Sequence, residues 1–194
     1  MSDADAEAVR SAIAASVAVK EALLRDPFPA QTARVASVMT ESLRAGGKVL
    51  FCGNGGSAAD AMHLAAELVG RFQLDRAPLP ALSLSDNVSS VTAIGNDYSY
   101  DQTFARQLRG LASAGDVLVA LSTSGSSANV LEAVRAAASL DVRTVAFTGA
   151  GGGELAGLAE LCVRIPSDST ARVQEGYMLL CHTACELVER ALFG

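Results

Sequence analysis

Five short apolar runs, separated by longer amphipathic segments, constrain the fold more than any other feature of this sequence. Each run is bounded by Gly, Pro, Ser or Asp. Apolar strands joined by helical crossovers are typical of a parallel sheet that is buried on both faces. We therefore expect an α/β fold, a three-layer α/β/α sandwich with a five-stranded parallel sheet formed by Val49–Cys52, Leu79–Leu84, Val117–Leu121, Thr144–Thr148 and Leu161–Ile165.

Helical periodicity precedes the first run and follows the last one. Apolar residues recur at helical spacing over residues 4–24 and 29–45, and again over Thr170–Leu192. Because no repeat or linker divides the chain, we expect one domain, with an N-terminal helical segment (1–46) and an α/β core (47–194). The N-terminal helices are weakly polar on any face, and we expect at least one of them to contact another subunit.

Charge and cysteine content narrow the classes of partner. The formal net charge is −6 and the fifteen Lys and Arg residues are scattered, so we expect no binding to nucleic acid. No apolar run reaches the roughly 18 residues that span a bilayer, and the N-terminus lacks the pattern of a secretory signal, so we expect no membrane association. The cysteines lie in apolar runs without a CxxC pair, which favours buried free thiols and a cytoplasmic location; they are Cys52, Cys162, Cys181 and Cys185.

Two loops that follow predicted strands are suited to bind an anion. In open α/β sheets, ligands bind beyond the carboxyl ends of the strands. The loop Gly53–Ala58 is rich in glycine and opens a helix, whose N–H groups favour negative charge. It also fits a dinucleotide fingerprint, but the acidic residue expected about twenty residues later is missing. The loop Ser122–Ser127 offers five hydroxyls, more than an N-cap needs, and we expect it to hold a phosphate.

The two histidines of the chain lie on apolar helices beside other side chains that can bind a metal. His63 and Glu67 are four residues apart, and Gln174 and His182 are eight apart, so each pair shares a helix face. Each pair alone is compatible with an ordinary surface contact. Together, the four side chains could hold Zn²⁺ or a similar ion, or supply a carboxylate base and an imidazole acid.

A third motif, Gly95-Asn96-Asp97, follows another apolar segment. Its polar side chains could donate and accept hydrogen bonds with sugar hydroxyls. The same residues are equally typical of a helix C-terminus that leads into an Asn/Asp turn. The residues alone leave both interpretations open.

Five stretches occur in an order and spacing that identify a family. They are GNGGSAADAMHLAAEL, AIGNDYSYD, LSTSGSSANV, FTGAGGGELAGLA and RVQEGYMLLCHTACELVERALFG, from about Lys48 to the C-terminus. They resemble the sugar isomerase (SIS) domain family and, within it, the phosphoheptose isomerases. The resemblance implies a flavodoxin-like sandwich, a homotetramer, and an aldose–ketose isomerase. The implied reaction converts D-sedoheptulose 7-phosphate to D-glycero-D-manno-heptose 7-phosphate through an enediol, as the first step of activated heptose synthesis.

The resemblance also implies a role for individual residues. Glu67 is expected to be the base and His182 its acid–base partner. Substrate is expected to contact Asn54, Gly55, Gly56, Ser57, Glu67, Asn96, Asp97 and Gln174, with its phosphate on Ser122, Thr123, Ser124 and Ser127. One Zn²⁺ per subunit is expected on His63, Glu67, Gln174 and His182. The sequence departs from its relatives at Tyr177, where they often carry His.

The main alternative is a protein of the same fold without enzymatic activity. One relative of the phosphoheptose isomerases is a tetrameric adaptor that binds the bacterial replication initiator, and the ending LVERALFG is similar to it. That relative lacks the helix Glu and the late His, whereas Glu67 and His182 are both present here. We therefore expect an enzyme.

Overall fold

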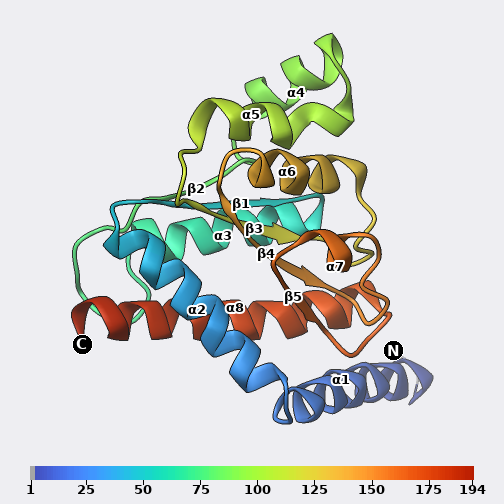
Figure 1. The fold of residues 1–194 in the computed structure, drawn as a ribbon. Helices are drawn as coiled ribbons and strands as arrows, with labels where there is room; N and C mark the ends of the chain where they lie inside the picture. The colour runs from blue at the N-terminus through green and yellow to red at the C-terminus, as the bar shows by residue number, and fades with distance from the viewer. Residues whose placement is uncertain (1–2) are drawn as a thin grey trace.

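The computed structural model, which describes residues 3–194, contains a parallel sheet between two layers of helices (Figure 1). The strand order is β2-β1-β3-β4-β5. The strands are β1 (Val49–Gly53), β2 (Ala81–Ser83), β3 (Val117–Leu121), β4 (Arg143–Thr148) and β5 (Leu161–Arg164). The predicted five-stranded α/β/α sandwich is thus confirmed. The expected strand over 79–84 is shorter, because β2 lies at the edge of the sheet and pairs with β1 over three residues only.

Helices cover both faces of the sheet (Figure 1). They are α1 (Asp3–Leu23), α2 (Phe28–Arg44), α3 (Gly56–Val69), α4 (Val88–Asp97), α5 (Thr103–Leu111), α6 (Ala128–Ala138), α7 (Leu155–Leu158) and α8 (Thr170–Phe193), with a 3₁₀ turn at Tyr100–Gln102. One face packs against α2, α3 and α8, and the other against α5 and α6. The long helices predicted near both ends of the chain therefore form within one residue of the expected bounds.

Alternate strand residues enter two separate hydrophobic cores, as period-2 side-chain geometry requires. Phe51 and Val119 face the core beneath α3 and α8, whereas Leu50 and Leu118 face the core beneath α6. Helix α2 is part of the first core, to which it contributes several buried side chains: Val35, Val38 and Met39. Helix α1 contributes only Val19 and Leu23 to the first core, and α4 has no buried residue.

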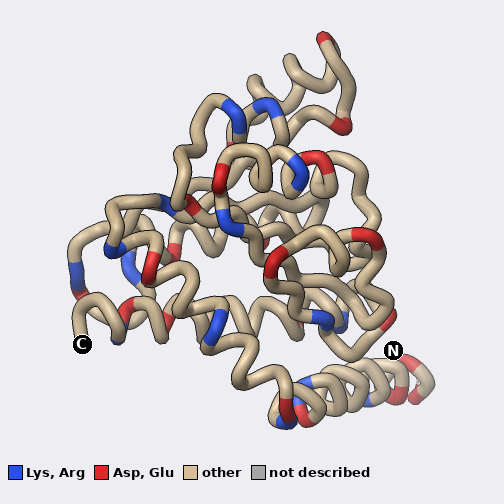
Figure 2. Tube along the Cα trace, in the orientation of Figure 1, with Lys and Arg blue, Asp and Glu red and all other residues tan. Residues whose placement is uncertain are grey.

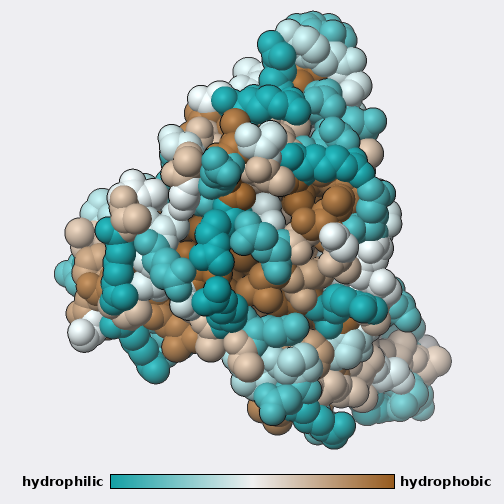
Figure 3. Space-filling model, viewed as in Figure 1, coloured by the Kyte–Doolittle hydropathy of each residue, from teal (hydrophilic) through white to brown (hydrophobic). Residues whose placement is uncertain are grey.

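Helix α1 leaves an apolar stripe uncovered. Val9, Ile13 and Val17 repeat every four residues and are 59%, 58% and 47% exposed. In Figure 3 this helix lies at the lower right, where pale brown side chains lie among white and teal ones. The helix is held to α8 by few polar contacts, among them the 2.6 Å hydrogen bond from Ser16 to Glu175. Such a face is typical of contact with another chain.

The remaining surface carries both charges, and Figure 2 shows Lys and Arg interspersed with Asp and Glu along the trace. Among residues 3–194, no helix is both long and apolar enough to cross a membrane. All four cysteines are free thiols, as predicted, and three of them are buried. Cys162 is only partly buried, because it lies on β5, the strand at the other edge of the sheet.

A buried ion pair fixes the loop between α3 and β2. Glu189 of α8 and Arg76 of this loop are both 1% exposed, and Arg76 Nε lies 2.9 Å from Glu189 Oε1. The carboxylate also accepts the backbone N–H groups of residues 72, 73 and 74 at 2.8, 2.8 and 3.1 Å. Burial alone would raise the pKa of Glu189, but the hydrogen bonds from the loop and from Arg76 outweigh it, so the pKa is lowered.

We expect Glu189→Gln to lower the free energy of unfolding at pH 7 by about 3–5 kcal/mol, because Arg76 would remain buried without a counter-charge. The depressed pKa means that this stabilisation is present above the ordinary Glu value of 4.5 and is lost as the pH falls below it. Urea denaturation from pH 7 down to about pH 3 measures both effects, because the loss continues until the pH passes the lowered folded pKa.

The matched control is Glu160→Gln, which removes an exposed carboxylate that pairs with Arg143. Its cost should stay below about 1 kcal/mol at pH 7. Wild type and Glu189→Gln should differ less in their free energy of unfolding below pH 4.5 than at pH 7. If this difference does not decrease, the stabilising role of the Glu189 carboxylate is contradicted.

Candidate active site

The two predicted anion-binding loops lie side by side. Strands β1 and β3 are neighbours in parallel register, with Gly53 opposite Leu121, so the loops that follow them leave the same edge of the sheet. Because β1 is flanked by β2 and β3, the strand order reverses direction at this point. Open α/β sheets bind ligands at such a switch point.

The first loop is held by a network of amides. Asn54 and Asn129 exchange two hydrogen bonds, of 2.8 and 2.9 Å, and the Tyr100 hydroxyl donates to Asn54 Oδ1 at 2.9 Å. Gly55, at the N-cap of α3, has φ = +56°, a conformation that favours glycine. The exposed backbone of Gly55 and Gly56 therefore faces solvent at the start of α3, beside a fixed Asn54.

The loop Ser122–Ser127, called the serine loop below, brings several hydroxyls to the start of α6. Ser127 occupies the N-cap position, and its hydroxyl lies 3.2 Å from the Ser122 hydroxyl, whereas the structure over residues 3–194 shows no bond from it to the first helical turn. Capping therefore does not account for these hydroxyls. Gly125 packs so closely on the next loop that a Cβ there would lie 2.0 Å from the Gly152 carbonyl oxygen. Thr123 is partly exposed and Ser124 is exposed beside it.

Asn96 and Asp97 are the last two residues of α4. Both side chains are exposed, and Asn96 Nδ2 donates to Asp97 Oδ1 at 2.9 Å. The helix C-terminus that the sequence allowed as one interpretation is therefore present. The following segment reaches the first loop through the bond between Tyr100 and Asn54, so this helix end lies near the switch point.

A chain of hydrogen bonds ties the start of α3 to α8. The Gln174 amide donates to Ser57 Oγ at 3.5 Å, the Ser57 and Tyr177 hydroxyls are 2.9 Å apart, and Tyr177 donates to Asp60 at 2.5 Å. Burial, assisted by Asp60, raises the pKa of Tyr177, so its hydroxyl remains a donor at neutral pH. A side chain at Gly56 would meet the Gln174 amide at 2.6 Å.

A second cluster forms further along the same two helices. His63 Nε2 lies 2.9 Å from Glu67 Oε1 and 3.0 Å from His182 Nε2. One ligand atom from each of these three residues lies within 4.8 Å of the others, so the three side chains could hold one metal ion. Three of the four predicted metal ligands are thus brought together.

The cluster is only partly shielded from water, since the Glu67 side chain is 21% exposed and that of His63 is 50% exposed. Burial lowers the pKa of His182 from its ordinary value, and the neighbouring His63 lowers it further, although Glu67 acts in the opposite direction. A neutral imidazole is the form that can bind a metal or accept a proton.

Gln174 does not join the cluster within one chain. Eight residues of helix separate it from His182, a rise of about 12 Å, and its amide contacts Ser57 instead. For the same reason, about 15 Å along α3 separate Ser57 from Glu67. One chain therefore carries two groups of site residues, one at the loops and one at the histidines.

Several residues of the site were not predicted from the sequence. Asn129 is the second residue after the serine loop and is buried, and a polar amide in the first turn of an otherwise apolar helix was a possible signal in the sequence. Tyr177 was noted only as a departure from the relatives. Tyr100 and Phe72, whose ring stacks on His182 with 5.5 Å between centroids, carried no signal, because tertiary contacts alone give them their place.

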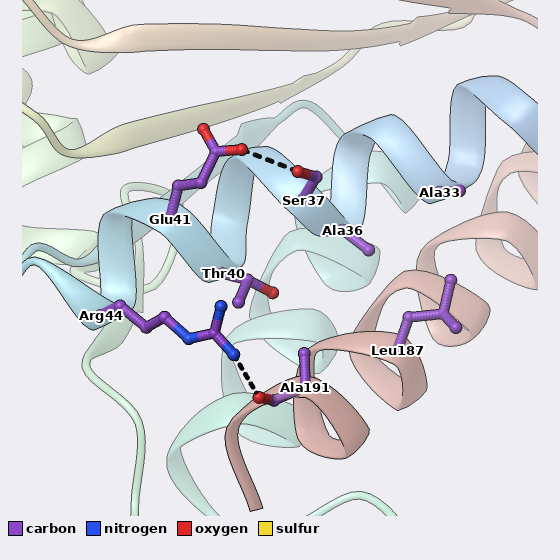
Figure 4. A pocket seen from close by; sticks show the side chains of 8 residues that line it. All are labelled: Ala33, Ala36, Ser37, Thr40, Glu41, Arg44, Leu187 and Ala191. Carbon is purple, nitrogen blue, oxygen red and sulfur yellow. Dashed lines mark hydrogen bonds between the residues drawn. The ribbon is translucent and has the colours of Figure 1, made fainter. Parts of the chain in front are cut away.

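A groove between α2 and α8 is not this site (Figure 4). Its charged groups and Ser37 already have partners: Ser37 donates to Glu41 at 2.7 Å, and Arg44 donates to the Ala191 carbonyl at 2.5 Å. None of the site residues predicted from the sequence lines it.

Known proteins resemble the chain over most of its length. The profile of the SIS domain family matches residues 14–149. A phosphoheptose isomerase of Rhodospirillum rubrum is 56% identical over 169 residues, which cover 87% of this chain and 89% of that protein.

Two solved structures have the same fold. The phosphoheptose isomerase GmhA of Neisseria gonorrhoeae superposes with a TM-score of 0.89 at 42% identity, over 95% of this chain and 98% of that one. The phosphoheptose isomerase of Francisella tularensis gives a TM-score of 0.92 at 36% identity, over 98% of this chain and 100% of that one.

Proposed function

The chain belongs to the SIS domain family and, within it, to the phosphoheptose isomerases, and from this membership we propose that it converts D-sedoheptulose 7-phosphate to D-glycero-D-manno-heptose 7-phosphate. The observation that carries the proposal is the cluster of His63, Glu67 and His182, which joins a carboxylate to two imidazoles. An adaptor of the replication initiator has no support among the relatives described above, which are named as isomerases. The reaction would open the synthesis of activated heptose.

The serine loop would hold the phosphate of the sugar. The hydroxyls of Ser122, Thr123, Ser124 and Ser127 and the N–H groups at the start of α6 are donors, and the helix dipole favours an anion there. The sugar hydroxyls would contact Asn54, the backbone of Gly55 and Gly56, and Ser57, with Asn96, Asp97 and Gln174 beside them. The donors and acceptors of these residues suit a polyol.

The reaction moves one proton between two carbons. Glu67 would remove the proton from C1 of the ketose, which leaves an enediol, and would return it to C2 so that the carbonyl forms at C1. His182 would move the other proton between the two oxygens. Both roles need groups near each other, and His63 bridges these two at 2.9 and 3.0 Å.

The donor set of the cluster fits Zn²⁺. Two imidazole nitrogens and one carboxylate oxygen within 4.8 Å of one another match the ligands of catalytic zinc sites, which leave a fourth position for substrate. Gln174 of the same chain contacts Ser57, so we propose His63, Glu67 and His182 as the ligands from one chain. A bound Zn²⁺ would polarise the carbonyl oxygen.

We further propose that the enzyme is a cytoplasmic homotetramer whose active sites are shared between chains. The four free thiols support the reducing compartment. The exposed stripe of Val9, Ile13 and Val17 supports contact between chains. Because about 15 Å separate Ser57 from Glu67 along α3, a second copy would bring its Glu67 cluster to the loops of the first.

Glu67→Gln and His182→Gln should each lower turnover of sedoheptulose 7-phosphate by at least about a hundredfold, because each removes a positioned acid–base group. The aldose product is followed by NMR. Glu132→Gln, which removes a carboxylate on α6 away from the cluster, is the control and should keep wild-type turnover. Near-normal turnover in both site variants would overturn the assignment of base and acid.

Chelator-treated protein should bind one Zn²⁺ per chain, measured by calorimetry. His63→Gln should weaken the binding at least about 10-fold, since even changes outside the ligand set cost 10- to 100-fold at metal sites. The same Glu132→Gln control should bind like wild type. Equal affinity in His63→Gln and wild type would refute the ligand set.

Mixed oligomers test whether sites are shared. Ser124→Asp should block phosphate binding by charge repulsion at an exposed position, and Glu67→Gln should block proton transfer. Each variant alone should be inactive. Co-expressed chains, purified through two different tags, should regain activity, because an intact serine loop on one chain can meet an intact Glu67 on another. Mixed oligomers that stay inactive would show that each site lies within one chain.

A further inference from the structure

An aromatic ring from the α3–β2 loop covers one face of the His182 imidazole. The Phe72 ring stacks on it with 5.5 Å between centroids and 13° between planes. The Nε2 edge of the same imidazole meets His63 Nε2 at 3.0 Å. Phe72 is partly buried and packs against the core beneath α3 and α8. The imidazole is therefore bounded on a face and at an edge.

The buried carboxylate of Glu189 anchors the backbone segment that carries this ring. The N–H of Phe72 itself donates to Glu189 Oε1 at 2.8 Å, and the two following N–H groups donate to Oε2. Glu189 follows His182 on α8 by seven residues, which is about two helical turns, so both lie on one face. Helix α8 thus carries both the imidazole and the anchor of the ring that covers it.

The same anchor reaches the end of α3. Arg76, which pairs with Glu189, donates to the backbone carbonyls of Glu67 and Leu68 at 2.9 and 2.7 Å. These carbonyls lie in the last turn of α3, where helical partners are missing. One buried ion pair therefore connects the backbone of Glu67, the backbone of Phe72 and the helix of His182.

A ring stacked on the His182 imidazole restricts the orientation of that imidazole. A partly exposed histidine can turn about its side-chain bonds, and a shift of about 1 Å in a reacting group can cost about 100-fold in rate. A stacked aromatic ring leaves the imidazole fewer orientations while its Nε2 edge stays open to His63.

We propose that Phe72 is a positioning residue that fixes the orientation of the His182 imidazole, and that the Glu189–Arg76 pair holds Phe72 for this purpose. The inference rests on the proposed function only where it concerns turnover. The stacking itself can be measured without substrate or metal.

The first experiment is NMR of chelator-treated protein labelled at the histidine ring carbons. The chain has two histidines, so the His63→Gln variant assigns the signal of His182. Ring current from Phe72 should move the His182 signal upfield in wild type, and Phe72→Leu should abolish that shift. Phe28→Leu is the matched control, because Phe28 is also partly buried against the same core, on α2. An identical His182 signal in wild type and Phe72→Leu would overturn the proposal.

The second experiment is kinetic. Phe72→Leu should lower kcat about 10- to 100-fold, the loss typical of residues that orient a functional histidine, with little change in KM. Phe72→Tyr, which keeps the stacked ring, should restore kcat, and Phe28→Leu should retain it. Equal kcat in Phe72→Leu and Phe28→Leu would refute the positioning role.

The two experiments separate the possible failures. An inactive wild type whose His182 signal is shifted upfield would contradict the proposed reaction and leave the stacking established. If Phe72→Leu does not fold, the chemical shift of His182 in wild type and in Phe72→Tyr tests the stacking instead. A His182 signal without an upfield shift in both of these proteins would overturn the inference.

Discussion

The parallel pairing of β1 with β3 is the constraint on which the site depends. Because Gly53 lies opposite Leu121, the first loop (Gly53–Ala58) and the serine loop (Ser122–Ser127) leave the same edge of the sheet. The amides of Asn54 and Asn129 then join the first loop to the helix that follows the serine loop. Parallel strands need covered faces, so the same pairing requires α3 and α6 to start at these loops and run back across opposite faces. Two helix N-termini consequently converge where an anionic ligand is expected.

The contact between α3 and α8 determines where the remaining site residues lie relative to one another. These helices meet first through Ser57 and Tyr177, and then through His63 and His182. Polar groups on otherwise apolar helices are costly to bury unless they bond each other, and along this contact they do. The loop after α3 adds the Glu189–Arg76 pair, so the segment that carries Glu67 is fixed at its C-terminal end as well.

Local patterns explain why much of this could be predicted. Continuous apolar runs identified the strands, and the spacing of His63 and Glu67 placed them on one helix face before any tertiary contact was known. Gln174 and His182 satisfied the same kind of spacing, yet eight residues of helix are about 12 Å long, so only His182 reaches the cluster. Phe72 and Tyr100 acquire their roles from chain segments distant in sequence, and no periodicity marks them. The strand β2 was predicted too long because the apolar content of a segment does not reveal that it lies at the edge of a sheet and pairs with one neighbour only.

The contact of Gly125 with Gly152 restricts how the serine loop can evolve. A methyl group on the first glycine would lie 2.0 Å from the carbonyl oxygen of the second, and the neighbouring Gly153 is crowded by the Gly125 carbonyl in turn. A side chain at Gly125 or at Gly153 therefore cannot be accommodated unless the opposite loop moves away. Such a movement would require simultaneous substitutions in both loops. Diversification toward other ligands is left to the exposed positions such as Ser124 and Ser126, whose side chains can change while the backbone path stays the same.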